Sequence, residues 1–206
     1  YYNLTFECWM YHPTIMFRRE PVLHVGAYSM LYSEDYDLFW KVSARYRIWN
    51  LAEPLVSYRL SPTSLNTVLK KKEYEIANEQ NVIRNIRFYV GDEFEIPTEC
   101  LECLRHNFEP ILKTGNLDAA VATLLILDQI TAKILEKENP NRNETWIREA
   151  HFYKREFIIT QLAGRLPALR KIDLLFRTGA WFVAWSLAMR FMRSQFRKVK
   201  SFLLSF

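Results

Sequence analysis

The stretch from His12 to Asn66 reads HPTIMFRREPVLHVGAYSMLYSEDYDLFWKVSARYRIWNLAEPLVSYRLSPTSLN, and it is the most informative part of the chain. Short apolar runs alternate in it with proline, glycine and serine, which is typical of strands and loops. We therefore expect short strands at residues 46–49 and 54–57, together with an apolar run at 14–17. This alternation of short apolar runs with turn residues ends near residue 66.

One helix is expected inside this stretch, from Asp35 to about Arg45. Ser33 is a residue type that often caps a helix N-terminus with its hydroxyl group. Glu34 and Asp35 would add favourable negative charge to the first helical turn.

Beyond residue 66 the pattern is almost entirely helical. Apolar residues recur at helical spacing, most clearly between Asn116 and Glu138. Gly91 and the Asn139-Pro140-Asn141 turn are typical helix stops. We expect helices at about 68–89, 97–107, 116–138, 144–163 and from about 167 onward. The predicted fold class is α+β by content but mostly α, in three regions: 1–66, 67–164 and 165–206.

The composition excludes several classes of protein. The chain has 206 residues, 50% hydrophobic and 15% aromatic, which suits one or two domains with a real core rather than a disordered chain. There is no run of 18 apolar residues able to span a bilayer and no signal peptide. The chain opens on Tyr1 without Met, so we expect a fragment or a processed product.

Charge is distributed unevenly along the chain. The net charge is +5, but residues 165–206 alone carry nine Lys or Arg and one Asp, a local +8, and the remaining residues sum to −3. A basic tail of this kind predicts an acidic partner, either anionic lipid or nucleic acid.

The tail also has an amphipathic pattern. Twelve uncharged residues, 178–189, include Trp181 and Trp185, but as a helix they would rise only about 18 Å and could not cross a bilayer. Farther on, aromatic residues alternate with Arg and Lys. A basic, aromatic helix is typical of a membrane interface. The alternative is that it packs on the helical region with its basic face in water.

Three cysteines give no even-numbered disulfide framework and indicate a reducing compartment. Cys100 and Cys103 are spaced as C-x-x-C, and His106 is the one further zinc ligand nearby. A redox pair would need a strand-to-helix context. Free thiols on a helix are therefore the favoured interpretation.

Three features of the stretch carry chemistry. Glu34 and Asp35 are adjacent carboxylates at an expected helix start, Gly26-Ala27-Tyr28 is a tight turn that can approach a ligand, and Tyr58-Arg59 presents a cation suited to phosphate or carboxylate. Taken singly, each has a plainer interpretation as a helix cap, an ordinary turn or a surface pair.

As an ordered set, these residues resemble the second half of the GT-A catalytic domain of family 2 glycosyltransferases. Val25-Gly26-Ala27-Tyr28 is similar to the family's Val-Gly-Gly-Tyr loop, and Glu34-Asp35-Tyr36-Asp37-Leu38 matches its Glu-Asp-Tyr-Asp-Leu element. Trp40 stands near the family's usual aromatic position.

The flanking segments extend this resemblance to about 55 residues, a quarter of the chain. His12-Pro13-Thr14, with residues 16–19, looks like the strand that follows the donor site. Residues 50–55, followed by Tyr58-Arg59, look like the strand leading to the family's Tyr-Arg-x-His ending. The fold implied is a truncated GT-A α/β remnant over residues 1–66, followed by an α-helical region.

The resemblance implies transfer of a sugar from a nucleotide-sugar donor to an acceptor hydroxyl, with inversion expected. It assigns Asp35 as the general base that takes the hydroxyl proton, and Glu34 as the residue that orients this base or contacts the acceptor. For two of the implied substrate contacts, Tyr36 and Trp40, core packing is the alternative. The implied contacts are His12, Gly26, Ala27, Tyr28, Tyr36, Trp40, Tyr58 and Arg59.

Two departures from the family pattern are visible. The half that binds the nucleotide, with an Asp-x-Asp motif for Mg²⁺ or Mn²⁺ and diphosphate, is absent, since Asp35-Tyr36-Asp37 belongs to the other motif. Ser61 stands where the family often has His. We therefore expect a metal-dependent parent enzyme whose metal ligands lie outside this chain, and a chain that is inactive alone.

The resemblance also implies where the parent enzyme acts. Enzymes of this kind often build surface polysaccharide or glycolipid on lipid-linked acceptors, so we expect a cytoplasmic protein at the inner face of the plasma membrane. The resemblance also favours anionic lipid, not nucleic acid, as the partner of residues 165–206. The alternative function is a non-catalytic helical interaction or membrane-anchoring module.

Overall fold

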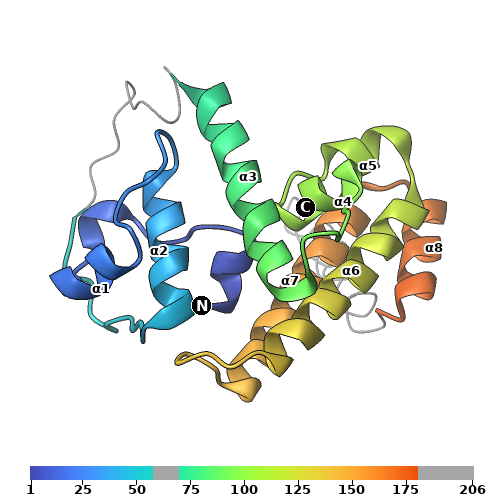
Figure 1. Ribbon diagram of the computed structural model, residues 1–206. Coiled ribbons are helices and arrows are strands. Elements are labelled where there is room, and N and C mark those ends of the chain that lie inside the picture. Colours follow the sequence, from blue (N-terminus) through green and yellow to red (C-terminus); the bar gives the residue numbers. More distant parts are fainter. Residues whose placement is uncertain (58–69, 181–206) are drawn as a thin grey trace, which may run out of the picture. The chain divides into compact units, whose positions relative to one another are not determined.

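The computed structural model describes residues 1–57 and 70–180, and over these ranges the chain is mostly helical, without a β-strand. It divides into two compact units (Figure 1). Unit 1 comprises Tyr1–Glu95 and Asp128–Ala150, and unit 2 comprises Ile96–Leu127 and His151–Phe206. Two long helices, α6 (Leu117–Glu136) and α7 (Glu144–Arg165), each contribute to both units.

Unit 1 is built around three helices: α1 (Arg19–His24), α2 (Glu34–Arg45) and α3 (Lys71–Val90). Short 3-10 turns, η1 (Tyr2–Thr5) and η2 (His12–Thr14), precede them. Helix α2 contacts α1, α3 and η1, so it is the central element of this unit. Its buried apolar side chains, Leu38 and Phe39 among them, pack with Val22 of α1.

Unit 2 contains α4 (Thr98–Leu104), α5 (Glu109–Thr114) and α8 (Ala168–Thr178), with the first part of α6 and the last part of α7. Its core is mainly aliphatic. The side chains that form it are buried almost completely: Leu101, Leu104, Ile111, Leu124, Ile158, Ile159 and Leu162.

The helices expected after residue 66 are confirmed within a few residues at each end. Helix α3 ends at Gly91, whose φ of +106° lies in the region that favours glycine. Helix α4 lies inside the expected 97–107 range, while α6 and α7 match the two clearest periodic stretches. Periodicity works here because each helix buries one continuous stripe.

The short helices α1 and α5 were not predicted from the sequence. Pro21 in α1 suggested a turn, yet proline is compatible with the first turn of a helix, where its missing N–H has no intrahelical acceptor. Pro110 lies at the same kind of position in α5. In both helices the proline lies in the first turn, and the one in α1 was interpreted as a break.

The prediction of strands at 46–49 and 54–57 is wrong. Without these strands, the described residues contain no α/β layer. The backbone at Tyr46 is extended, with φ −128° and ψ 153°. A strand also needs a neighbouring strand to pair its N–H and C=O groups. Here the side chain of Asn141 takes that place: its Oδ1 accepts from the Ile48 N–H at 2.7 Å, and its Nδ2 donates to the Tyr46 carbonyl at 2.8 Å.

The final helix begins as expected, directly after Pro167, but ends at Thr178. Gly179, with φ +63°, terminates it in a Schellman motif, in which the Ala180 N–H reaches the Leu175 carbonyl at 3.1 Å. The uncharged stretch with Trp181 and Trp185 lies mostly outside the described residues. Among the helices that the structure describes, none is long and apolar enough to cross a membrane.

Candidate functional site

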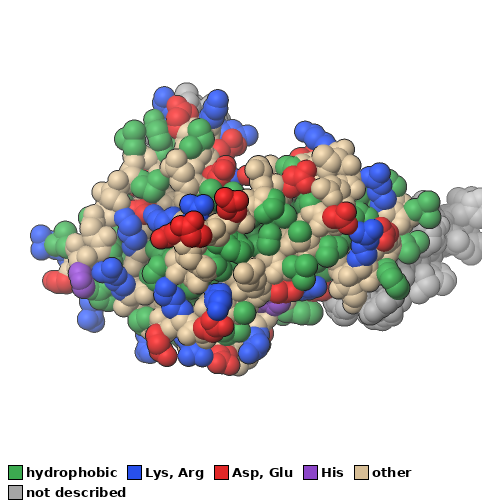
Figure 2. Space-filling model, turned by 45° about the vertical axis from the view of Figure 1, so that its right-hand side comes forward, with side chains coloured by type: hydrophobic (Ala, Val, Ile, Leu, Met, Phe, Trp, Pro, Cys, Tyr) green, Lys and Arg blue, Asp and Glu red, His purple; other side chains and the backbone are tan. Residues whose placement is uncertain are grey.

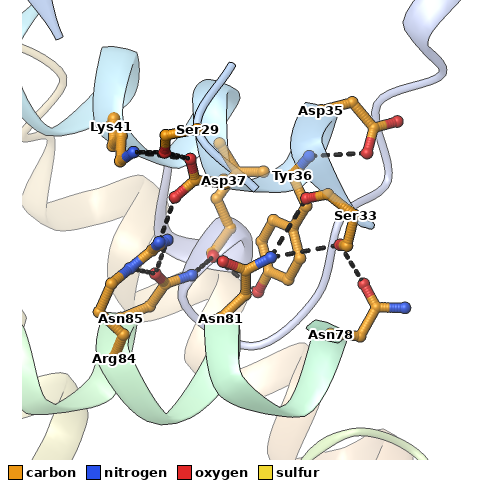
Figure 3. A network of polar contacts seen from close by, with 11 residues as sticks. Ser29, Ser33, Asp35, Tyr36, Asp37, Lys41, Asn78, Asn81, Arg84 and Asn85 are labelled. Carbon is orange, nitrogen blue, oxygen red and sulfur yellow. Dashed lines mark hydrogen bonds and ion pairs between the residues drawn. The ribbon is translucent and has the colours of Figure 1, made fainter. Parts of the chain in front are cut away.

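The candidate site lies at the N-terminus of α2 in unit 1. Ser33 precedes the helix with φ +54°, a left-handed conformation that is uncommon for serine. The sequence predicted that its hydroxyl would cap the helix, but it makes no capping hydrogen bond. It donates instead to Asn78 Oδ1 at 2.5 Å and accepts from Asn81 Nδ2 at 3.2 Å, so two α3 side chains hold the helix start (Figure 3).

Behind this start lies a buried polar network centred on Asp37. Its carboxylate accepts hydrogen bonds from Ser29 Oγ at 2.9 Å and Lys41 Nζ at 2.6 Å, and it forms an ion pair with Arg84 of α3. Burial opposes ionisation of Asp37, but the hydrogen bonds from Lys41 and Ser29 and the positive charges outweigh it and lower the pKa. Asp37 is therefore an ionised structural anchor between α2 and α3.

The two predicted catalytic carboxylates, Glu34 and Asp35, lie half-buried in the first turn of α2. Asp35 Oδ1 accepts the N–H of Tyr36 at 2.8 Å, and its carboxylate points away from the Asp37 network (Figure 3). Glu34 Oε2 is buried and has no hydrogen-bond partner among the described residues. A buried carboxylate oxygen without a partner is costly and calls for an explanation.

A tyrosine and a histidine lie near these carboxylates. The Tyr28 hydroxyl is 2.8 Å from Nε2 of His12. Burial and then the negative charges of Asp35 and Glu34 raise the pKa of Tyr28. His12 and Tyr28 therefore lie together, and the charges of Asp35 and Glu34 act on Tyr28.

The turn that carries Tyr28 is the C-terminus of α1. Gly26, with φ +89°, occupies the left-handed position of a Schellman motif, in which the Ala27 N–H donates to the Val22 carbonyl at 2.9 Å. Gly26 and Ala27 were predicted to approach a substrate. The hydrogen bonds of this turn show that both residues end α1 and orient Tyr28, while the predicted approach to a substrate stays a prediction.

Tyr36 and Trp40 are core residues, which is the alternative that the sequence left open for these two implied substrate contacts. The Tyr36 side chain is buried, and its hydroxyl donates to the Leu4 carbonyl at 2.9 Å. Burial raises the pKa of Tyr36. Trp40 packs edge-on against Phe88 and lies beneath the Arg84 guanidinium, 4.9 Å from the ring centroid. Tyr58 and Arg59, also predicted contacts, lie outside the described residues.

The described residues do not fit a divalent metal. Over 1–57 and 70–180, no group of three His, Cys, Asp or Glu side chains is arranged to hold an ion. Asp37, one half of the Asp35-Tyr36-Asp37 sequence, is engaged by Lys41 and Arg84.

Cys100 and Cys103 are buried free thiols on α4, as the sequence favoured. Burial raises the pKa of Cys103 to about 12 and also raises that of Cys100. His106 Nε2 lies 3.2 Å from Lys154 Nζ. Neither thiol therefore has the lowered pKa that is typical of a reactive cysteine.

Sequence reasoning missed an open apolar groove in unit 1. It has a volume of about 1340 Å³ and is lined along residues 9–56. Large apolar side chains on its walls are exposed: Trp9, Tyr11, Met16, Trp49, Leu51 and Leu55. The density of aromatic residues over 9–17 and 46–49 was the available signal. An exposed apolar surface of this kind marks a place where another surface binds.

Comparison with known proteins found no match among protein-family models, curated proteins or solved structures.

Proposed function

We propose that this chain supplies the acceptor side and the general base of a nucleotide-sugar-dependent glycosyltransferase. The observation that carries the proposal is the orphan Glu34 oxygen beside Asp35, at a strained helix start. An incoming hydroxyl group would give the buried oxygen its missing partner. Strained backbone and unsatisfied polar groups are typical of functional sites.

In this proposal Asp35 is the base. Its side chain is half-buried and directed away from the Asp37 network, so one carboxylate oxygen is left to take the proton of the acceptor hydroxyl as that oxygen attacks the anomeric carbon. Glu34 accepts a hydrogen bond from a neighbouring hydroxyl of the acceptor and orients it. Tyr28, backed by His12, donates to an acceptor oxygen.

The donor-binding half must come from residues other than those of this chain. The apolar groove along residues 9–56 supports this part of the proposal, because it offers a large surface on which such a half can pack. The donor sugar and its diphosphate, with any metal, would then be held by that half. The chain alone is expected to be inactive.

The test is sugar transfer by the protein as its gene encodes it, measured with a panel of uridine, guanosine and thymidine diphosphate sugars. Asp35→Asn should lower kcat roughly 100- to 10,000-fold, because a positioned general base contributes about that much. Affinity for the matching nucleoside diphosphate should change less than about twofold, since Asp35 acts on the acceptor. The control is Glu93→Gln, an exposed loop carboxylate, which should retain full activity.

Retained turnover in Asp35→Asn would rule out Asp35 as the base. A second candidate function, a non-catalytic interaction module, is favoured by the apolar groove itself. The encoded sequence distinguishes the two. An Asp-x-Asp segment encoded ahead of Tyr1 supports the transferase, while a start codon immediately before Tyr1 together with no transfer from any donor supports the module.

A further inference from the structure

Helix α8 carries two apolar stripes on opposite faces. Leu174 and Leu175 point into the core of unit 2 and are buried. Leu169, Ile172 and Phe176 follow the spacing i, i+3, i+7 and form one continuous outer stripe. They are 83%, 64% and 72% exposed, respectively. A stripe of three large apolar side chains at this exposure is unusual for a helix whose other face is already packed.

The buried Leu174 and Leu175 orient the helix, and polar contacts near both ends accompany this packing. At its C-terminus, Arg177 donates to Asp173 at 2.9 Å and to Asp118 of α6 at 2.6 Å, while Gly179 closes the last turn. Near its N-terminus, the Arg170 guanidinium lies against Gly115, where even a single added Cβ would meet it. The outer stripe therefore lies on the surface of unit 2, away from its core.

The charges around the stripe are basic. Arg165, Arg170, Lys171 and Arg177 lie on or just before α8, and Arg177 is paired with two carboxylates, Asp173 of α8 and Asp118 of α6. Figure 2 shows hydrophobic side chains among basic and acidic ones on the face of the molecule that it draws. The sequence beyond α8, residues 181–206, adds five Lys or Arg and no acidic residue.

We propose that α8 binds the surface of an anionic lipid bilayer, with the outer stripe of Leu169, Ile172 and Phe176 inserted among the headgroups and acyl chains. An apolar stripe flanked by cations fits this partner, because the stripe gains from leaving water while the cations gain from the negative surface. A protein partner would need acidic groups around an apolar pocket, whereas a nucleic acid offers charge but no apolar layer for the stripe. This inference does not depend on the transfer reaction.

The test is flotation of the full chain with lipid vesicles, either pure phosphatidylcholine or containing about a third phosphatidylserine. Wild type should float with the anionic vesicles and much less with the neutral ones. Raising NaCl from about 0.1 M to about 0.5 M should weaken binding, since exposed charges are screened. The double variant Leu169→Gln and Ile172→Gln should bind anionic vesicles roughly tenfold more weakly, because it removes two inserted side chains.

A matched control distinguishes the stripe from general surface hydrophobicity. The double variant Leu23→Gln and Leu125→Gln removes two exposed leucines on other helices, α1 and α6, and should bind as wild type. Thermal unfolding should be unchanged in both double variants, because all four side chains are exposed.

Three results would overturn the proposal. The first is that the stripe variant floats as well as wild type, and the second is that wild type binds neither kind of vesicle. The third is a wild-type dimer in solution that the stripe variant converts to a monomer without any change in flotation, which would make the stripe a contact between copies. Binding to an oligonucleotide in place of vesicles falls under the second result and would identify nucleic acid as the partner.

Discussion

The Nζ atom of Lys41 lies 2.6 Å from Oδ2 of Asp37, one turn away along α2. Arg84 approaches the other carboxylate oxygen from α3, so the buried Asp37 joins α2 to α3 through Arg84 while it also pairs with Lys41 of its own helix. Removing the charge leaves both cations without their anion. Asp37→Asn should therefore lower the free energy of unfolding by about 2 kcal/mol, measured by urea denaturation.

The control for this substitution is Asp118→Asn. Asp118 also accepts from an arginine, Arg177, but its side chain is 90% exposed. Water and salt screen such a pair, so its loss should change stability little. Equal effects of the two substitutions would contradict the anchoring role of Asp37.

The same carboxylate predicts a pH dependence. The pKa of Asp37 is lower in the folded state than its usual value of about 3.8. The contribution of Asp37 to the free energy of unfolding is then complete above the pKa that it has in the unfolded state. It is lost as pH falls through the pKa that it has in the folded state, because the unfolded state binds the proton first. The difference in unfolding free energy between wild type and Asp37→Asn should be constant from pH 7 to about 5 and shrink below about 4. A difference that grows toward acid would contradict the sign of the shift.

The helices that could be predicted from the sequence are the long ones. Helices α3, α6 and α7 each run for five or more turns and repeat their apolar residues often enough for the period to be read. Helix α1 has only six residues, too few to show a period. Its signals were local, a proline in the first turn and Gly26 just past the end, and both were interpreted as turn residues.

The contacts of the candidate site were only partly predictable. The pairing of Asp37 with Lys41 is an i, i+4 relationship that sequence spacing contains. Arg84 approaches Asp37, while Asn78 and Asn81 approach Ser33. Each of these contacts joins residues more than 40 positions apart, so no local pattern reveals it. The strand predictions at 46–49 and 54–57 were wrong for the same reason. A strand forms only where a second segment pairs with its backbone, and that segment cannot be identified from the local sequence.

The role of Tyr36 is open to a direct measurement. Its buried hydroxyl donates to the Leu4 carbonyl, which also accepts from Asn85 Nδ2 at 3.0 Å. Tyr36→Phe leaves that second bond in place, so it should cost only about 1 kcal/mol of stability. Sugar transfer should persist in this variant. A large loss of kcat at unchanged stability would instead return Tyr36 to the substrate site.

Two glycines should respond to alanine in opposite directions. Gly26 has φ +89° with open space around the position of a Cβ, so Gly26→Ala should destabilise by about 1 kcal/mol through backbone strain alone. Gly164 lies within α7, also with open space, and Gly164→Ala should stabilise by up to about 1 kcal/mol. Both are measured by thermal unfolding. Stabilisation by Gly26→Ala would show that α1 does not end in the motif described.

The three thiols should be slow to react in the native protein. Burial raises the pKa of Cys8 to about 11 and that of Cys103 to about 12, and Cys100 shifts in the same direction. Because the thiolate is the reactive form, reaction with a disulfide reagent at neutral pH should be at least about tenfold slower than for a free thiol. In denaturant all three should react at once. Cys8 is only half-buried, so it should react first in the native state, and Cys8→Ser should remove that earliest phase. A fast native phase that survives Cys8→Ser would place an activated thiol on α4 and restore the redox interpretation of Cys100 and Cys103.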